Sequence, residues 1–144
     1  MKFSTKTKYG LSAMILLAEY YESKTLKSLV SLSEELGISK IYLEQVFSQL
    51  KGNELVVSIK GPKGGYRLSR DAKEISVLNI LQATESSLFD AEESPSNNIE
   101  ITSFEMVFHP FQNHIVEFFS KISLYDLMEK FDQINFNDSF MYYL

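Results

Sequence analysis

The segment of this chain that is best suited to bind an anion is residues 58–70, SIKGPKGGYRLSR. Four glycine or proline residues are interspersed there with four basic residues, although the whole chain carries a net charge of −5. A glycine-rich basic segment suits two chemistries. It can hold a phosphate group for catalysis, or it can lie against the phosphate backbone of a nucleic acid. The basic residues are Lys60, Lys63, Arg67 and Arg70.

Few other residues offer a catalytic or metal-binding arrangement. The chain has no cysteine, which excludes disulfides, thiolate metal sites and cysteine redox chemistry. On a helix, His109 and His114 would point about 140° away from each other, unlike the i, i+4 pair that zinc favours. The carboxylates Glu92 and Glu93 lie in a polar segment, where we expect them to be solvated. We therefore expect no metal, no cofactor and no enzymatic activity.

Charge is divided unevenly along the chain. Residues 1–73 contain 12 Lys or Arg against 7 Asp or Glu, whereas residues 74–144 contain 2 against 12. This division suggests a polyanion-binding module joined to a part that does other work, and a chance distribution is the alternative. The longest apolar run, residues 13–18, is far shorter than the roughly 20 residues of a membrane span. With no signal-peptide cleavage pattern either, we expect a cytoplasmic protein of one domain, or one domain plus an appended element.

Helices are expected before the basic segment, over residues 4–21, 28–36 and 39–51. A serine can cap each of them, and Gly37 ends the second. The two short helices joined by Gly-Ile-Ser give a helix-turn-helix signal, which helix pairs that do not bind DNA also share. The apolar side of the third helix is predicted to consist of Ile41, Leu43, Val46, Phe47 and Leu50, with Leu43 and Val46 in the core.

The basic segment itself is predicted to be a β-hairpin, with strands at residues 55–59 and 66–68 and a turn between them. A catalytic phosphate loop needs its glycines at a strand-to-helix junction, followed by a lysine and a hydroxyl residue. This hairpin lacks that arrangement, so the nucleic-acid interpretation is favoured, with Lys60 and Lys63 at the tip. The alternative is a solvated hairpin whose lysines protect an edge strand. A helix-turn-helix followed by a hairpin is a winged helix, so the predicted fold is mainly α.

The rear of the chain is predicted to be helical after an acidic linker. A serine-capped helix is expected at residues 76–85, and a longer helical pattern begins at Phe104. Pro110 interrupts that pattern and predicts a kink or a helix start. A last capped helix is expected over residues 124–131. One apolar side of the longer pattern consists of Phe108, Phe111, Ile115, Phe118, Phe119 and Ile122.

Several of these segments resemble the Rrf2 family of bacterial winged-helix transcription regulators. The resemblance is carried by STKTKYGL near the start, YLEQVFSQLK, the basic hairpin and EISVLNIL, and it is close over residues 1 to about 85. It implies a winged helix-turn-helix DNA-binding domain at residues 1–85, an acidic linker at 86–99, and dimerisation helices with a tail at 100–144. It also implies a homodimer that reads a palindromic operator in double-stranded DNA, as a repressor. Lys60 departs from the arginine that is common in the family.

The resemblance, with the helix pattern, assigns the DNA contacts to three places. Ser4, Thr5, Lys6 and Lys8 resemble backbone contacts at the start of the first helix, and Ser28 and Ser39 cap helices whose free amides can face phosphates. Lys40, Tyr42, Glu44 and Gln45 begin the recognition helix. There Gln45 could pair with adenine and Glu44 could accept a hydrogen bond from cytosine. The wing contacts are Lys60, Gly61, Lys63, Gly64 and Arg67.

The apolar side of the rear helix suits a dimer contact, because its phenylalanines exceed what one small domain is expected to bury. The alternative is that they pack only within their own chain. Many family members hold an iron–sulfur cluster on three cysteines before this helix. The absence of cysteine excludes such a cluster here.

The resemblance extends to a cluster-free branch, which includes the cysteine metabolism repressor of Gram-positive bacteria. That branch is controlled by complex formation with cysteine synthase, so this enzyme is an expected partner. The aromatic tail, Met141, Tyr142, Tyr143 and Leu144, could enter an enzyme pocket that binds carboxylates, or it could cover the dimer core. A regulator that senses a small molecule or another stress signal, and a winged helix used only for protein contacts, are the remaining alternatives.

Overall fold

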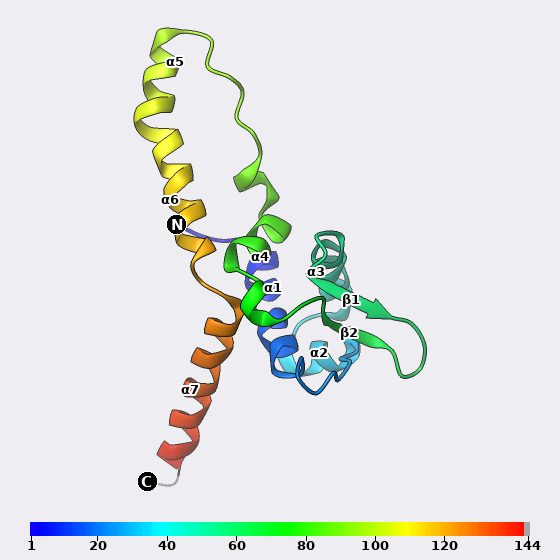
Figure 1. Cartoon of the computed structure of the whole chain (residues 1–144). Helices are drawn as coiled ribbons and strands as arrows, with labels where there is room; N and C mark the ends of the chain where they lie inside the picture. The colour runs from blue at the N-terminus through cyan, green and yellow to red at the C-terminus, as the bar shows by residue number, and fades with distance from the viewer. Residues whose placement is uncertain (143–144) are drawn as a thin grey trace.

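The computed structural model describes residues 1–142, which form a helical body with three projections (Figure 1). The wing extends to one side, a long helix rises on the other, and the last helix points down. The elements are α1 Thr5–Glu19, α2 Leu29–Leu36, α3 Lys40–Gly52, β1 Val56–Ile59, β2 Gly65–Leu68, η1 Ala72–Glu74, α4 Val77–Thr84, η2 Ser86–Phe89, α5 Asn98–Ser103, η3 Phe104–Phe108, α6 His109–Ser120 and α7 Leu124–Tyr142. No helix in this part of the chain is both long and apolar enough to cross a bilayer.

Serine side chains begin the front helices, as the sequence predicts. The hydroxyls of Ser4 and Ser28 accept hydrogen bonds from the third backbone amide beyond them, at 3.2 and 3.1 Å. Ser39 does the same at 3.5 Å. Each cap satisfies one of the amides that the first helical turn leaves free. Gly37 ends α2 with a φ of 65°, which glycine adopts without strain.

The core of the body lies between α1, α3, α4 and the base of the wing. Met14, Leu32, Phe47 and Ile80 are completely buried, one from each of the first four helices. A polar contact crosses this interior, where the hydroxyls of Thr7 and Thr84 are 3.0 Å apart. Both threonines are buried, and Thr84 also donates to the carbonyl of Ile80. The helical part of the winged helix-turn-helix expected from the sequence is therefore present, with its helices packed around one core.

The wing is an antiparallel hairpin braced at its base by a third segment. β1 and β2 pair in a register that places Val56 opposite Leu68. Lys27 and Tyr66 exchange two backbone hydrogen bonds of 2.9 and 2.8 Å, so the segment before α2 pairs with β2. The Lys27 ammonium lies 2.5 Å from the Glu35 carboxylate and 4.3 Å from the centre of the Tyr20 ring. The hydrogen bond to Glu35 raises the pKa of Lys27 despite its partial burial.

The rear helix begins earlier than the sequence predicts. The Asn97 side chain accepts hydrogen bonds from the amides of Ile99 and Glu100, both at 3.0 Å, so helical structure starts at Asn98 rather than at Phe104. Pro110 lacks an amide to donate to the preceding turn. The turn before it, Phe104–Phe108, is a π turn, in which the His109 amide donates a hydrogen bond to the Phe104 carbonyl. The interruption predicted at Pro110 is therefore a local widening of a continuous helix.

The last helix is longer than expected and is joined to the body at its start. α7 extends to Tyr142 rather than to Phe131, so Met141 and Tyr142, which the sequence analysis assigned to a tail beyond the last helix, belong to that helix. The other two tail residues, Tyr143 and Leu144, lie outside the described residues. The amide of Leu124 donates to the Ile75 carbonyl at 2.7 Å, and the Leu124 side chain is fully buried.

Candidate nucleic-acid interface

One face of α3, together with the first turn of α1, forms a shallow polar recess. Its volume is about 480 Å³, and its lining is Lys6, Ile41, Glu44, Gln45, Ser48 and Gln49. Counted from Ile41, the other α3 residues in this lining follow at three, four, seven and eight positions, the spacing that places side chains on one helical face. The predicted contacts Lys6, Glu44 and Gln45 are thus neighbours in space. Ser48 and Gln49 were not among the predicted contacts, although their spacing from Gln45 and Glu44 could have identified them.

The opposite face of α3 packs in the core. One residue, Ile41, differs from the predicted apolar side of this helix. Leu43 and Val46 are completely buried, as expected. Ile41 is not part of the apolar side, because 72% of its surface is exposed. It precedes Glu44 by one helical turn and shares the outward face with that residue. Hydrophobicity alone assigned Ile41 to the apolar side of the helix, whereas its helical position places it at the recess.

Two predicted contacts at the start of the recognition helix differ in their surroundings. Lys40 is exposed, as a phosphate contact requires. Tyr42 is half-buried, and its ring meets that of Tyr9 edge to face, with ring centres 5.2 Å apart. Such aromatic pairs stabilise packing beyond the area they bury. Tyr42 therefore holds α3 against α1, whatever its hydroxyl contacts.

At the start of α1, the capping serine is held by the end of α4. The backbone amide of Ser4 donates to the Glu85 carboxylate, and the hydrogen bonds from Ser4 lower the pKa of Glu85. These bonds fix the position of the first turn of α1 relative to α4. Thr5 and Lys8 remain exposed and Lys6 is half-buried. The N-terminal turn of α1 is thus presented beside α3 in a fixed position.

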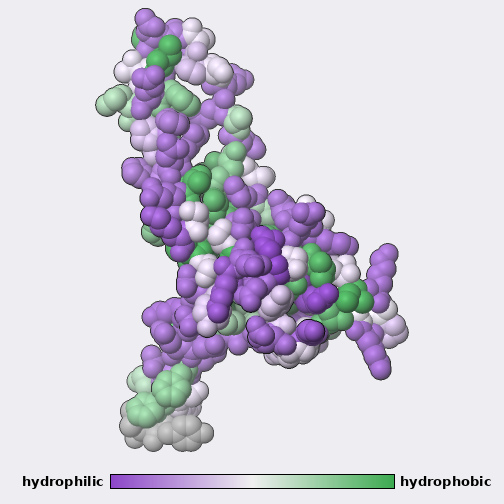
Figure 2. Space-filling view, viewed as in Figure 1, coloured by the Kyte–Doolittle hydropathy of each residue, from purple (hydrophilic) through white to green (hydrophobic). Residues whose placement is uncertain are grey.

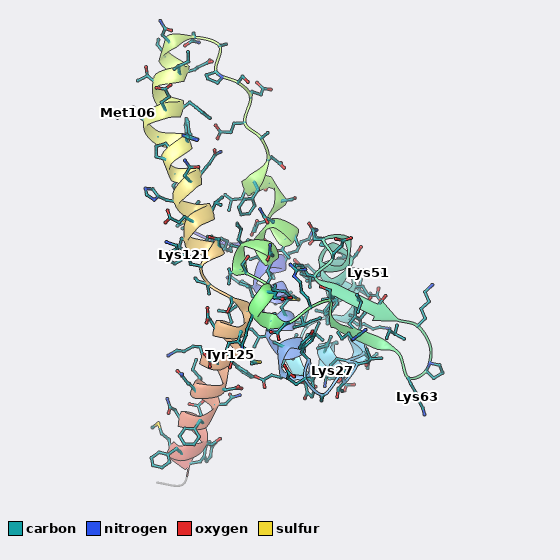
Figure 3. The ribbon with its side chains drawn as sticks, viewed as in Figure 1. Lys27, Lys51, Lys63, Met106, Lys121 and Tyr125 are labelled. Atoms are coloured by element: carbon teal, nitrogen blue, oxygen red, sulfur yellow. The ribbon has the colours of Figure 1, made fainter. Side chains whose placement is uncertain are left out.

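In the wing, the lysines are exposed to solvent, whereas the glycines shape the hairpin turn. Lys60 and Lys63 are exposed at the tip, and Figure 3 shows Lys63 extending into solvent. Gly61, with a φ of 113°, has open space around it, so its role is the turn itself. A side chain on Gly64 would place its Cβ 2.0 Å from the Ile59 carbonyl oxygen. Gly64 therefore permits the close approach of the hairpin strands.

Arg67 occupies a different position from the wing lysines. It lies in β2 opposite Val57 rather than at the tip, and it is half-buried. Its Nε is buried and has no hydrogen-bond partner among residues 1–142. A buried donor of this kind is costly unless a partner satisfies it. Any contact from Arg67 would have to come from the terminal nitrogens of its guanidinium group.

Taken together, α3 and the wing project from the side of the body opposite to α6 and α7 (Figure 1). In Figure 3, Lys63 and Lys121 lie at opposite edges of the molecule. Charge follows the same division, because the basic front half of the chain supplies α3 and the wing. This side offers exposed lysines from α3 and the wing, together with polar side chains on an outward helix face. A polyanion with a regular groove fits such a surface.

The rear helix carries exposed aromatic residues where the sequence predicts a dimer contact. Phe108, Phe111 and Phe118 are 46, 51 and 61% exposed. Ile115, Phe119 and Ile122 are half-buried. A cavity of about 1120 Å³ lies between this face and the N-terminal segment. The rings of Phe3 and Phe119 meet there edge to face, with their centres 6.0 Å apart. Figure 2 shows apolar atoms gathered where α6 meets the body.

Residues 1–142 contain no cluster of three or more His, Cys, Asp or Glu residues placed to bind a metal ion. His109 stacks on Phe104, with ring centres 5.8 Å apart, whereas His114 lines the cavity beside α6. With no cysteine in the sequence, an iron–sulfur cluster has no thiolate ligands in this chain.

Comparisons with known proteins agree with this geometry. The family model for Rrf2, described as an iron-dependent transcriptional regulator, matches residues 3–130. The HTH-type transcriptional regulator IscR of Vibrio vulnificus (strain YJ016) is 34% identical over 142 residues, which cover 96% of this chain and 83% of that protein.

Solved structures of similar fold include two regulators. CymR, described as the global cysteine regulator of B. subtilis, matches with a TM-score of 0.74 and 29% identity, over 90% of this chain and 98% of that one. IscR of T. potens matches with a TM-score of 0.70 and 34% identity, over 90% of this chain and 88% of that one.

Proposed function

The chain belongs to the Rrf2 family of transcriptional regulators, and on that premise we propose that it is a homodimeric, sequence-specific repressor that works without an iron–sulfur cluster. Rrf2 regulators bind DNA and are typically dimeric. The finer proposal is that two copies present their α3 helices to a palindromic operator. Two-fold symmetry would place these helices about one helical turn of DNA apart, or a multiple of it.

The observation that carries this proposal is the grouping of Lys6, Glu44 and Gln45 in one recess, on the side of the body that also bears the wing. Lysines hold the protein in register through phosphates, whereas glutamine and glutamate can distinguish base edges in the major groove. The Ser28 and Ser39 caps leave further amides of α2 and α3 free for phosphates.

The wing lysines give the first test. Because each phosphate contact releases counterions, the dependence of affinity on salt reports their number. We expect Lys60→Ala with Lys63→Ala to weaken operator and unrelated DNA alike. The slope of log affinity against log salt should fall by about one per lysine in each subunit. Fluorescence anisotropy over a salt series with labelled duplexes measures this slope.

Lys130→Ala is the matched control, since Lys130 is an exposed lysine on α7 at the other end of the molecule. It should leave both affinity and slope unchanged. An equal slope for the wild type and the double wing variant would reject the wing as a phosphate contact.

For the signal, we propose control of cysteine metabolism through a complex with cysteine synthase. The support is the absence of cysteine ligands and the likeness to a regulator described as the global cysteine regulator of B. subtilis. The contact would be made by residues 141–144. Phe136, Phe140, Met141 and Tyr142 on the last turns of α7 are 56–91% exposed, so apolar surface is available there.

Deleting residues 141–144 tests that contact. We expect the deletion to abolish binding to purified cysteine synthase in calorimetric titration while operator binding persists. In the branch that this chain resembles, the complex with cysteine synthase reports the level of O-acetylserine, so adding O-acetylserine to the full-length complex should also release the enzyme. Unchanged affinity of the truncated protein for the enzyme would reject the tail as the contact.

A further inference from the structure

Ile41 is an apolar residue on an otherwise polar face. It lies in the first turn of α3, two residues after the cap Ser39, and 72% of its surface is exposed. The other side chains of its recess, among them Lys6, Glu44 and Gln45, are polar or charged. The fold does not need Ile41 for its core, because other α3 side chains, among them Leu43, Val46 and Phe47, are completely buried on the interior side of the helix.

The position of Ile41 is the part of a recognition helix that approaches base edges most closely. Glu44 and Gln45 follow it at i+3 and i+4, so all three side chains project from the same face. Bases offer one apolar group in the major groove, the 5-methyl group of thymine. A β-branched side chain suits that contact, because its χ1 is restricted in a helix and little rotational freedom is lost on binding.

We propose that Ile41 determines specificity by packing on the 5-methyl group of a thymine, next to the base pair that Glu44 or Gln45 contacts. This inference rests on the proposed function, because it requires α3 to enter the major groove. Lys6 in the same recess supplies a cation beside Ile41, and exposed Lys40 precedes it in the chain. The surface around the isoleucine is therefore suited to the edge of a duplex rather than to another apolar surface.

Replacing thymine by deoxyuridine removes only the methyl group, so the contact can be isolated. The probe is a duplex recovered by the wild-type protein from a randomised DNA library, with each thymine replaced in turn. We expect one symmetry-related pair of positions at which the replacement weakens wild-type binding about fourfold per site, the value for one buried methyl-sized group. At the same pair, Ile41→Ala should bind thymine and deoxyuridine equally, and Ile41→Val should keep most of the discrimination.

Ile101→Ala is the matched control, since Ile101 is an exposed isoleucine on α5, far from α3. It should show the wild-type sensitivity to deoxyuridine. Thermal unfolding should show that Ile41→Ala folds as the wild type does, because the side chain is exposed. If wild type and Ile41→Ala lose the same affinity at every deoxyuridine, the inference is overturned while the regulator stands. If the wild type selects no duplex from the library, sequence-specific DNA binding itself is overturned, and this inference with it.

Discussion

At the scale of single residues, the two glycines Gly65 and Gly52 have different structural roles. Gly65 has a φ of 152°, and a side chain there would place its Cβ 2.8 Å from the carbonyl carbon and oxygen of Lys27. Gly52 ends α3 with nothing within 4 Å of its Cβ position. The first glycine lets the segment before α2 pair with the wing. The second could be replaced by any helix-forming residue.

Substituting alanine at each position tests this difference. Gly65→Ala should lower the free energy of unfolding by about 2 kcal/mol or more, because it combines a disfavoured backbone conformation with a backbone contact that cannot relax. Gly52→Ala should be neutral or stabilise by up to about 1 kcal/mol. Urea unfolding followed by circular dichroism measures both. Equal stability of the two variants would mean that the base of the wing can shift to admit a side chain.

Ile41 shows that residue type alone can mislead the prediction of a site. Its hydrophobicity assigned it to the apolar side of the third helix, whereas its spacing from Glu44 and Gln45 places it on the outward face. Where hydrophobicity and periodicity disagree, periodicity decides, because the backbone fixes the direction of each side chain.

At the scale of elements, the contact between α1 and α7 contains a pair of carboxyl groups. Glu19 ends α1, and its carboxyl group is hydrogen-bonded to that of Asp132 on α7. Partial burial, this hydrogen bond and the negative charge of Asp132 together raise the pKa of Glu19 from 4.5 to about 7. Two carboxyl groups can share such a bond only while one of them is protonated.

The docking of α7 should therefore weaken as pH rises from 4.5 to 7. Over that range the folded protein binds more protons at Glu19 than the unfolded chain does, so the free energy of unfolding falls with increasing pH. Glu19→Gln keeps a hydrogen-bonding group without the charge and should flatten this part of the pH profile. Glu22→Gln, at an exposed neighbouring glutamate, should not. Denaturant unfolding at several pH values distinguishes them, and identical profiles would show that the pair does not affect docking.

The π turn before Pro110 is also a feature of an element rather than of a residue. Because one turn contains an extra residue, the side chains beyond it are rotated by about 100° relative to an uninterrupted helix. The exposed face that α5 presents is thereby brought into a different alignment with the phenylalanines of α6. The sequence predicted an interruption at Pro110, but it gave no reason to prefer a π turn to a kink.

At the scale of the whole molecule, α3 and the wing lie on one side of the body and the rear helix lies on the other (Figure 1). A dimer formed through α6 would leave α3 and the wing of each copy free to contact DNA. The exposed phenylalanines of α6 support that arrangement, because large apolar surfaces on soluble proteins mark association sites.

Phe118→Glu should convert the dimer into monomers. Phe118 is 61% exposed in the single chain. In a symmetric dimer the substitution occurs once in each subunit, so each copy would remove a buried aromatic ring from the interface and place a charge there. We expect the dimer dissociation constant to rise about 100-fold or more. Sedimentation equilibrium measures it. Phe136→Glu on α7, where the phenylalanine is 70% exposed, is the control and should remain dimeric. A dimeric Phe118→Glu protein would place the interface elsewhere.

Serine caps, glycine stops and apolar periodicity act over a few neighbouring residues, so the amino-acid sequence was enough to predict the starts of α1, α2 and α3, the hairpin and, through its motifs, the family. It also determined that no thiolate can bind a metal in this chain. The packing of the helices, by contrast, sets which outward residues share the recess with Lys6, that Tyr42 packs on Tyr9, and that Glu19 meets Asp132. Those contacts join residues that are far apart in the chain. They depend on how the helices cross, which short-range patterns do not specify.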